Sequence, residues 1–318
     1  MSDLAPALAP DRLAFPPAPL TPEGERIARG TGTPADARRL FDELAGETRA
    51  AVAAYLAPFK GRRGLLDPKL RGSAGWPKGQ PRGAVLHVPA LHGRVALDSL
   101  DTVRRFMVRS PGQQKSTHLV IGWPDGRIFV PVHPRDRSWH AGKANQTCLG
   151  IDVVSPGPLV PVGDTWRRWD GQGSAIVRPD GSPLMPGEDI LDFGEDPACR
   201  PWKHRYWHQP TPAQIFGLTL ALRALRLLHP TMQPELVVRH ADLDPANRVD
   251  PGPGVPLEAV RVWAWGNEDL VALFTEVAAG DPRGWSGFLL RQWLAPQGIA
   301  TAIDLRCPGR PVRAGEVV

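Results

Sequence analysis

Residues 235–254 read ELVVRHADLDPANRVDPGPG, an apolar run followed by a loop of small, polar and proline residues. The β-branched run ELVVR predicts a short strand that delivers His240 to the loop. The prolines and glycines of the loop favour a chain that folds back on itself. We therefore expect the side chains of His240 and Asp250, which bracket the first part of the loop, to face one point.

A histidine and an aspartate that face one point suit a zinc ion, which binds imidazole nitrogen and carboxylate oxygen at about 2.0–2.2 Å. Catalytic zinc sites usually have three protein ligands and leave a fourth position for water. His87 is the candidate for the third ligand, because it lies in the apolar segment AVLHVPA, where an unpartnered imidazole is costly to bury. Each histidine alone also fits a hydrogen-bonded core residue, and Asp250 alone fits a turn cap. Only the combination predicts a metal site.

Segments of alternating pattern extend outward from this site. Apolar and β-branched runs bounded by turn residues predict strands, and Pro124, Asp125 and Gly126 predict a hairpin turn between two of them. Apolar residues at helical spacing predict helices. The predicted strands are 84–90, 117–122, 127–132, 148–154 and 235–239, and the predicted helices are 34–56, 99–108 and 211–229. This order predicts an α/β fold with a central mixed β-sheet flanked by helices.

Three regions carry little of this pattern and are expected to be additions to a domain over residues 81–262. Residues 1–80 are predicted to hold an extended arm over 1–33 and the helix at 34–56, with no assigned role. Residues 155–210 are rich in Gly, Pro, Asp and Trp and are interpreted as an insertion with little regular structure. Residues 263–318 form a C-terminal extension of unknown role.

The composition indicates the general type of protein and the kind of partner it could bind. The 318 residues carry a formal net charge of +5 and are 42% hydrophobic and 22% charged, which is typical of a soluble globular protein. The positive charge favours an anionic partner such as a cell-wall polymer, a nucleic acid or a membrane surface. Because the sequence has neither a nucleic-acid-binding motif nor a run of about eighteen apolar residues, we expect no nucleic-acid partner and no transmembrane segment.

The first residues and the cysteines bear on localisation. The N-terminus, MSDLAPALAPDRLAFPPAPL, lacks a basic region, and prolines interrupt its apolar residues, so it does not resemble a Sec signal. We therefore expect a cytoplasmic protein, although a specialised export route is compatible with the same sequence. Cys148, Cys199 and Cys307 are too few and too scattered for a disulfide framework.

Five segments in order resemble one known family, the zinc-dependent N-acetylmuramoyl-L-alanine amidases of the AmpD kind, whose fold is shared with peptidoglycan-recognition proteins. The segments are AVLHVPA, STHLVI, SWHAG, CLGIDV and HADLDPANRVDPGPG, within residues 84–154 and 211–254. The resemblance implies that His87, His240 and Asp250 bind one zinc ion. It also implies hydrolysis of the lactyl-amide bond between N-acetylmuramic acid and L-alanine in bacterial peptidoglycan or muropeptides.

The resemblance assigns roles to five further residues. Asp152 aligns with an acidic residue, usually glutamate, that transfers protons, and Arg248 aligns with a lysine that stabilises the oxyanion. Arginine keeps the charge but does not release a proton. The alternative for both residues is an ordinary surface ion pair. His118, Trp139 and His140 are expected to line the cleft and bind substrate, although structural support is an equally good interpretation of the two histidines.

Two other functions stay open on the sequence. A recognition protein of the same fold binds peptidoglycan without cutting it, usually after losing a zinc ligand, and here all three ligand positions are filled. The same amidase chemistry also serves in antibacterial toxins and phage lysis enzymes, in which terminal additions support delivery. The additions at both ends of this chain are compatible with that use.

Overall fold

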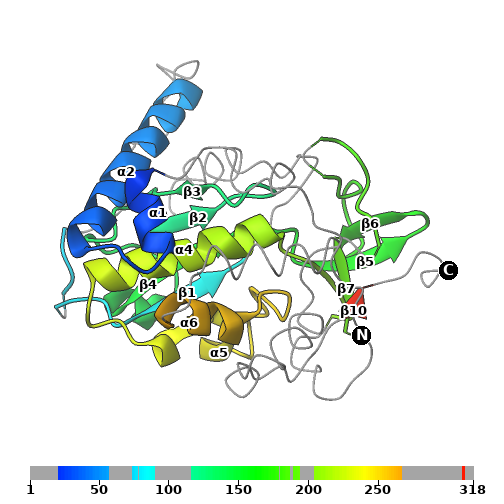
Figure 1. Ribbon diagram of the computed structural model, residues 1–318. Helices are drawn as coiled ribbons and strands as arrows, with labels where there is room; N and C mark the ends of the chain where they lie inside the picture. The colour runs from blue at the N-terminus through cyan, green and yellow to red at the C-terminus, as the bar shows by residue number, and fades with distance from the viewer. Residues whose placement is uncertain are drawn as a thin grey trace, which may run out of the picture.

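The computed structural model contains two five-stranded β-sheets and a set of helices packed against one of them, the central sheet (Figure 1). It describes residues 21–56, 74–77, 79–89, 116–178, 180–186, 189–193, 204–266 and 310–311. The central sheet is mixed, and the predicted α/β fold with a central mixed sheet is confirmed.

The central sheet has the strand order β3-β2-β4-β1-β9. Its strands are β1 (Gly83–His87), β2 (Leu119–Ile121), β3 (Ile128–Phe129), β4 (Cys148–Val153) and β9 (Val237–Arg239). All neighbours are parallel except β2 and β3, which form the predicted hairpin. Gly126 in its turn has a φ of +68° and lies against the backbone of Ala213, so no side chain fits there.

Side chains of the central sheet alternate between its two faces, as the pleat of a strand requires. On one face, Leu86 of β1 and Ile151 of β4 belong to the main hydrophobic core, together with residues of the helices. The intervening residues His87, Gly150 and Asp152 are not part of that core. The period of two therefore gives the sheet a helix-covered face and an opposite face that carries polar groups.

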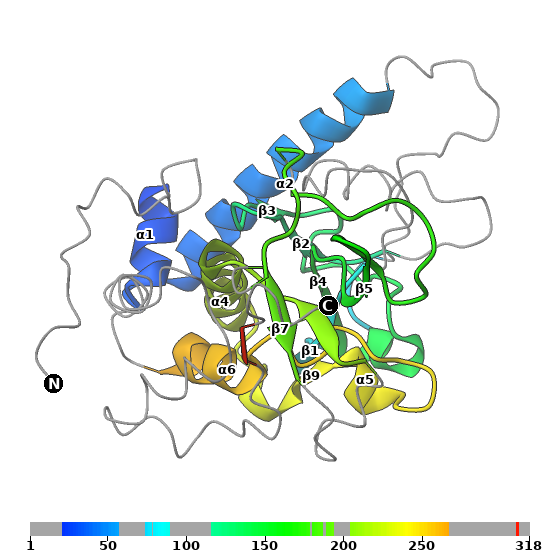
Figure 2. The ribbon, with the colours of Figure 1, turned by 90° about the vertical axis from the view of Figure 1, so that its right-hand side faces the viewer.

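The helical layer is centred on α4 (Pro212–Leu228), which contacts α1, α2 and α6 and lies across the central sheet (Figures 1 and 2). The other helices are α1 (Pro22–Ala28), α2 (Pro34–Leu56), α5 (His240–Leu243) and α6 (Leu257–Trp265), with short 3-10 helices at Gly142–Gln146 (η3) and Pro234–Leu236 (η5). Thr211 and Gln214 form a capping box at the start of α4. The predicted helices at 34–56 and 211–229 are thus confirmed within one residue.

Helix α1 corrects the expectation that residues 1–33 form an extended arm. Thr21 caps the helix by accepting a hydrogen bond from the Gly24 N–H at 3.1 Å, and Pro22 occupies the first turn. Ile27 is fully buried in the main core. The buried guanidinium of Arg223 donates to the Ala28 carbonyl at 3.1 Å and so ties the end of α1 to α4. Tertiary packing thus stabilises a helix too short to be recognised by its period.

The second sheet corrects another expectation, that residues 155–210 have little regular structure. Its strands are β5 (Pro158–Val162), β6 (Thr165–Arg168), β7 (Ile190–Asp192), β8 (Tyr206–His208) and β10 (Arg310–Pro311), in the antiparallel order β10-β7-β8-β5-β6. The strands are short, and β5 contains two prolines. Apart from the local β5–β6 hairpin, the sheet pairs segments that lie far apart in the sequence, which local alternation does not reveal.

Some sequence expectations fall outside the described residues. These include the predicted helix at 99–108 and nearly all of the extension at 263–318. Across the parts of the chain that the structure describes, no helix combines the length and the apolar character needed to cross a membrane.

Candidate metal centre and active site

The candidate site lies at the carboxyl edge of three parallel strands. His87 is the last residue of β1, and His240 directly follows the last residue of β9, which pairs with β1. Asp152 in β4 is the direct register partner of His87. Parallel strands that end together bring their last side chains to one edge, where α/β folds commonly bind ligands.

The loop after β9 folds back as its sequence predicts. It begins with the single helical turn α5, and the Ala241 N–H donates to the Asp250 carbonyl at 2.9 Å. This hydrogen bond brings Asp250 back beside His240 although nine residues separate them. Gly252, with a φ of +76°, then passes against the ring of Trp207, where any side chain would collide.

Three potential ligand atoms converge at this point. The Nδ1 atoms of His87 and His240 each lie 3.3 Å from Oδ2 of Asp250. The two imidazole rings are 4.5 Å apart between centroids. All three ligand atoms lie within 4.8 Å of one another, and among the described residues no other group of histidine, cysteine or acidic side chains is arranged in this way. Two imidazole nitrogens and one carboxylate oxygen fit a catalytic zinc site in type and number.

The electrostatics of Asp250 match a ligand role. Burial alone would raise the pKa of its carboxyl, but the interactions with the adjacent imidazoles of His240 and His87 outweigh this and hold the pKa below its ordinary value. The carboxylate is therefore in the ionised form that binds a cation.

Asp152 lies beside the ligand cluster on the polar face of the sheet. It is only 5% exposed and is the neighbour of His87 across the β1–β4 pair. A carboxylate here is close to the ligands without being one of the three convergent groups.

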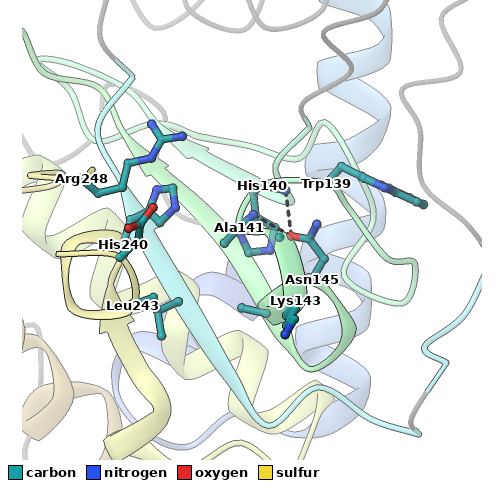
Figure 3. Close-up of a pocket in the computed structure, with 11 residues that line it drawn as sticks. Trp139, His140, Ala141, Lys143, Asn145, His240, Leu243 and Arg248 are labelled. Carbon is teal, nitrogen blue, oxygen red and sulfur yellow. Dashed lines mark hydrogen bonds between the residues drawn. The ribbon is translucent and has the colours of Figure 1, made fainter. Parts of the chain in front are cut away.

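A pocket of about 560 Å³ opens beside these ligands (Figure 3). His240 and Arg248 lie on one side of it, and His140 and Asn145 lie on the other. The lining residues are Trp139, His140, Ala141, Gly142, Lys143, Ala144, Asn145, His240, Leu243, Asp244 and Arg248. Trp139 and His140, which were expected to line the cleft, and Arg248 are all lining residues of this pocket, and the guanidinium of Arg137 stacks on the Trp139 ring at 4.2 Å.

Sequence reasoning missed several lining residues. Lys143 and Asn145 belong to the 3-10 helix η3, and Leu243 and Asp244 lie at the end of α5. Their only sequence signal is proximity to the SWHAG segment and to His240. The local spacing of polar residues does not reveal which of them face a pocket.

His118 is not at the pocket surface. It has no exposed area, and its ring stacks on Trp76 with 5.4 Å between centroids. Its Nδ1 accepts from the Gly150 N–H at 2.8 Å, and its Nε2 donates to the Asp136 carbonyl at 2.8 Å. His118 therefore offers no exposed surface to a substrate in this structure, and its hydrogen bonds favour the alternative role of structural support.

Buried neutral histidines predict sensitivity to acid. Burial lowers the pKa of His118 from 6.5 to about 3 and that of His229 from 6.5 to about 4. The unfolded chain therefore binds more protons below pH 6.5, so stability is full above that pH and falls as the pH drops toward 4. The His229 shift alone corresponds to about 3 kcal/mol between pH 7 and 4.

Urea unfolding at pH 7, 6, 5 and 4 checks this prediction. A His229→Gln variant, which keeps hydrogen-bonding capacity but does not titrate, should lose clearly less stability on acidification than the unmodified protein. An unfolding free energy that is constant from pH 7 to 4 would contradict the expected coupling.

The fold and this site define an α/β protein with a convergent His-His-Asp cluster beside a pocket. Residues 77–253, more than half of the chain, match the N-acetylmuramoyl-L-alanine amidase family, Amidase_2, and the protein belongs to that family. The matched range contains all eight residues singled out from the sequence. A search of curated proteins found no match.

The solved structures to which the chain is similar include amidases and an endolysin. AmpDh3 from Pseudomonas aeruginosa is 18% identical, with 80% of this chain and 81% of that chain covered and a TM-score of 0.36. The amidase AmiD from E. coli, solved in complex with the substrate anhydro-N-acetylmuramic acid-L-Ala-D-gamma-Glu-L-Lys, is 21% identical, with 63% of each chain covered and a TM-score of 0.37. A mutant endolysin from Bacillus subtilis is 15% identical, with 59% and 86% covered and a TM-score of 0.32.

Proposed function

We propose that the protein is a zinc-dependent N-acetylmuramoyl-L-alanine amidase that hydrolyses the lactyl-amide bond between N-acetylmuramic acid and L-alanine in peptidoglycan or muropeptides. The observation that carries the proposal is the convergence of His87, His240 and Asp250 beside a pocket, in a chain of the amidase family. We further propose that residues 81–262 form the catalytic domain.

The donor set supports zinc as the metal. Two neutral imidazoles and a carboxylate leave a position for water, which distinguishes a catalytic site from a closed structural one. When bound, zinc supplies Lewis-acid activation of the amide carbonyl and of the attacking water. His87, His240 and Asp250 would hold it, and the pocket would bind the muramyl and peptide groups on either side of the scissile bond.

Asp152 is proposed as the general base and acid. It is the register partner of His87 at the carboxyl edge of the sheet, so its carboxylate would be available to the attacking water. It would accept a proton from the water and return a proton to the leaving nitrogen of L-alanine. The two proton transfers balance, and the Asp152 carboxylate is regenerated at the end of the cycle.

Arg248 is proposed to donate hydrogen bonds to the oxyanion that develops on the carbonyl oxygen. It lines the pocket on the same side as His240 (Figure 3). Hydrogen-bond donors that already face the position of the oxyanion stabilise the transition state more than the substrate.

Removal of the positive charge of Arg248 should lower kcat. We expect Arg248→Met to reduce kcat by about 10²–10³-fold, as for loss of an oxyanion donor. Arg248→Lys keeps a positive donor and should stay within about tenfold of the unmodified protein. Steady-state kinetics on a muropeptide would check both values, and an Arg248→Met variant with unchanged kcat would exclude the oxyanion role.

Mass spectrometry of reaction products tests the function as a whole. Purified muropeptides and intact sacculi would each be incubated with zinc-loaded protein and with EDTA-treated protein. We expect stem peptides with a free L-alanine amino group only in the zinc-loaded reactions, and the two substrates show whether polymer or fragment is preferred. Substrate that is bound but uncut would instead identify a peptidoglycan-recognition protein.

A further inference from the structure

His140 connects a proposed metal ligand to the backbone of the central sheet. Its Nδ1 lies 3.0 Å from Nε2 of His87, and its Nε2 lies 3.0 Å from the carbonyl oxygen of Cys148 at the start of β4. The rings of His87 and His140 meet edge to face, with centroids 5.2 Å apart. The two imidazoles and the carbonyl therefore form one chain of hydrogen bonds.

The Cys148 carbonyl at the end of this series of hydrogen bonds determines the direction of each of them. A carbonyl oxygen only accepts, so the proton between His140 and Cys148 must lie on Nε2 of His140. In neutral His140 the Nδ1 is then an acceptor, and the proton shared with His87 must lie on Nε2 of His87. Neutral His87 is left with a bare Nδ1.

That bare Nδ1 is the atom aimed at the metal site. It lies 3.3 Å from Oδ2 of Asp250, which is itself 3.3 Å from Nδ1 of His240. A bare nitrogen facing a carboxylate oxygen leaves two lone pairs opposed, an arrangement that a cation between them relieves. The chain of hydrogen bonds thus selects the one tautomer of His87 that can bind a metal through Nδ1.

Two further contacts hold His140 in this orientation. Its ring lies directly over Gly150 of β4, where a Cβ atom would be only 2.6 Å from Cγ of the imidazole, so glycine is required at that position. The backbone N–H groups of His140 and Ala141 both donate to Oδ1 of Asn145, at 2.9 and 2.7 Å. Figure 3 shows these two hydrogen bonds at the edge of the pocket.

We propose that His140 is a positioning residue that fixes the tautomer and the ring orientation of His87 for metal binding, with Gly150 and Asn145 holding His140 in place. The inference rests on the proposed function, because it concerns a ligand of the proposed zinc site. Of the two interpretations of His140 from the sequence, substrate binding and structural support, it follows the second, since both ring nitrogens are engaged within the protein.

Three variants separate this role from a general contribution to stability. His140→Phe keeps the planar shape but removes the acceptor for His87 and the donor for Cys148. His140→Gln restores one acceptor and one donor on the same side chain. His229→Phe is the matched control, because His229 is a buried imidazole with both ring nitrogens hydrogen-bonded, to Gln80 and to the Pro134 carbonyl, and it contacts none of the proposed ligands.

Zinc affinity is the first readout, measured by competition with a chromophoric chelator on protein shown to be folded by circular dichroism. His140→Phe should weaken zinc binding by about 10–100-fold, the usual effect of losing a partner behind a metal ligand. His140→Gln should recover most of that loss, and His229→Phe should bind zinc like the unmodified protein. The visible spectrum of the Co²⁺-loaded protein should change in His140→Phe alone.

The tautomer of His87 in metal-free protein is the second readout, and it does not depend on zinc binding. Long-range ¹⁵N–¹H spectra of the histidine rings should show His87 protonated on Nε2 in the unmodified protein and a mixture of tautomers in His140→Phe. An Nδ1-protonated His87, or folded His140→Phe with unchanged zinc affinity and Co²⁺ spectrum, would overturn the positioning role. Failure of the unmodified protein to bind zinc would instead overturn the proposed function itself.

Discussion

His87→Ala, His240→Ala and Asp250→Ala will each lose stoichiometric zinc and amidase activity. Each substitution removes one of three atoms that converge within 4.8 Å, and two remaining ligands do not hold a catalytic ion firmly. Lewis-acid stabilisation is worth several kcal/mol, so we expect activity to fall by about 10³-fold or more. Inductively coupled plasma mass spectrometry of the dialysed variants gives the metal content, and product analysis gives the rate.

A control histidine shows whether these losses are specific. His133 donates from Nε2 to Oδ1 of Asp42 at 3.1 Å and is not among the convergent ligands, so His133→Ala should keep one zinc per chain and most of the activity. Circular dichroism of all four variants separates loss of metal from loss of fold. If two of the three ligand variants retained activity, the zinc mechanism would be wrong.

Asp152→Asn will keep zinc but lose turnover. Asparagine has nearly the same size and keeps hydrogen-bonding capacity, so the variant should fold, but it does not accept a proton from water. General acid–base catalysis contributes about 10²–10⁴-fold, and kcat should fall by that factor with little change in KM. The position of Asp152 beside His87 across the β1–β4 pair is the reason for the prediction.

The companion variant is Asp152→Glu, which restores a carboxylate with one more methylene group. It should recover activity far above that of Asp152→Asn, with zinc content equal in both. An unchanged kcat in Asp152→Asn would mean that a group other than Asp152 transfers the proton. Loss of zinc in Asp152→Asn would show that Asp152 supports the metal rather than the reaction.

The parts of the fold that local pattern determines could be predicted from the sequence. The buried runs around His87 and Asp152 are strands because their side chains alternate between a helix-covered face and the site. The loop from His240 to Asp250 could be predicted to close because its prolines and small residues favour a tight return. Helix α4 carries its own capping box and period.

The parts that depend on distant contacts could not be predicted. The second sheet joins β10 at Arg310–Pro311 to β7 at Ile190–Asp192, a pairing that no local spacing encodes. Helix α1 is stable because Ile27 and Ala28 are buried in the main core. His118 is buried among hydrogen-bond partners on two other segments, Gly150 and Asp136, and the sequence showed only a histidine on a predicted strand.

The relation between His140 and Gly150 illustrates the same limit within the site. Both residues lie in segments that resemble the family, SWHAG and CLGIDV. Only the structure shows that the glycine makes space for the imidazole ring and that the ring reaches His87. A sequence motif therefore marked the residues, and the three-dimensional contacts suggested what they do.

Titration of zinc into metal-free protein, with the release of L-alanine-terminated peptide followed at each step, tests the central claim most directly. We expect no cleavage without metal and a linear rise in rate that ends at one zinc per chain. Full cleavage by protein shown to be metal-free would contradict it.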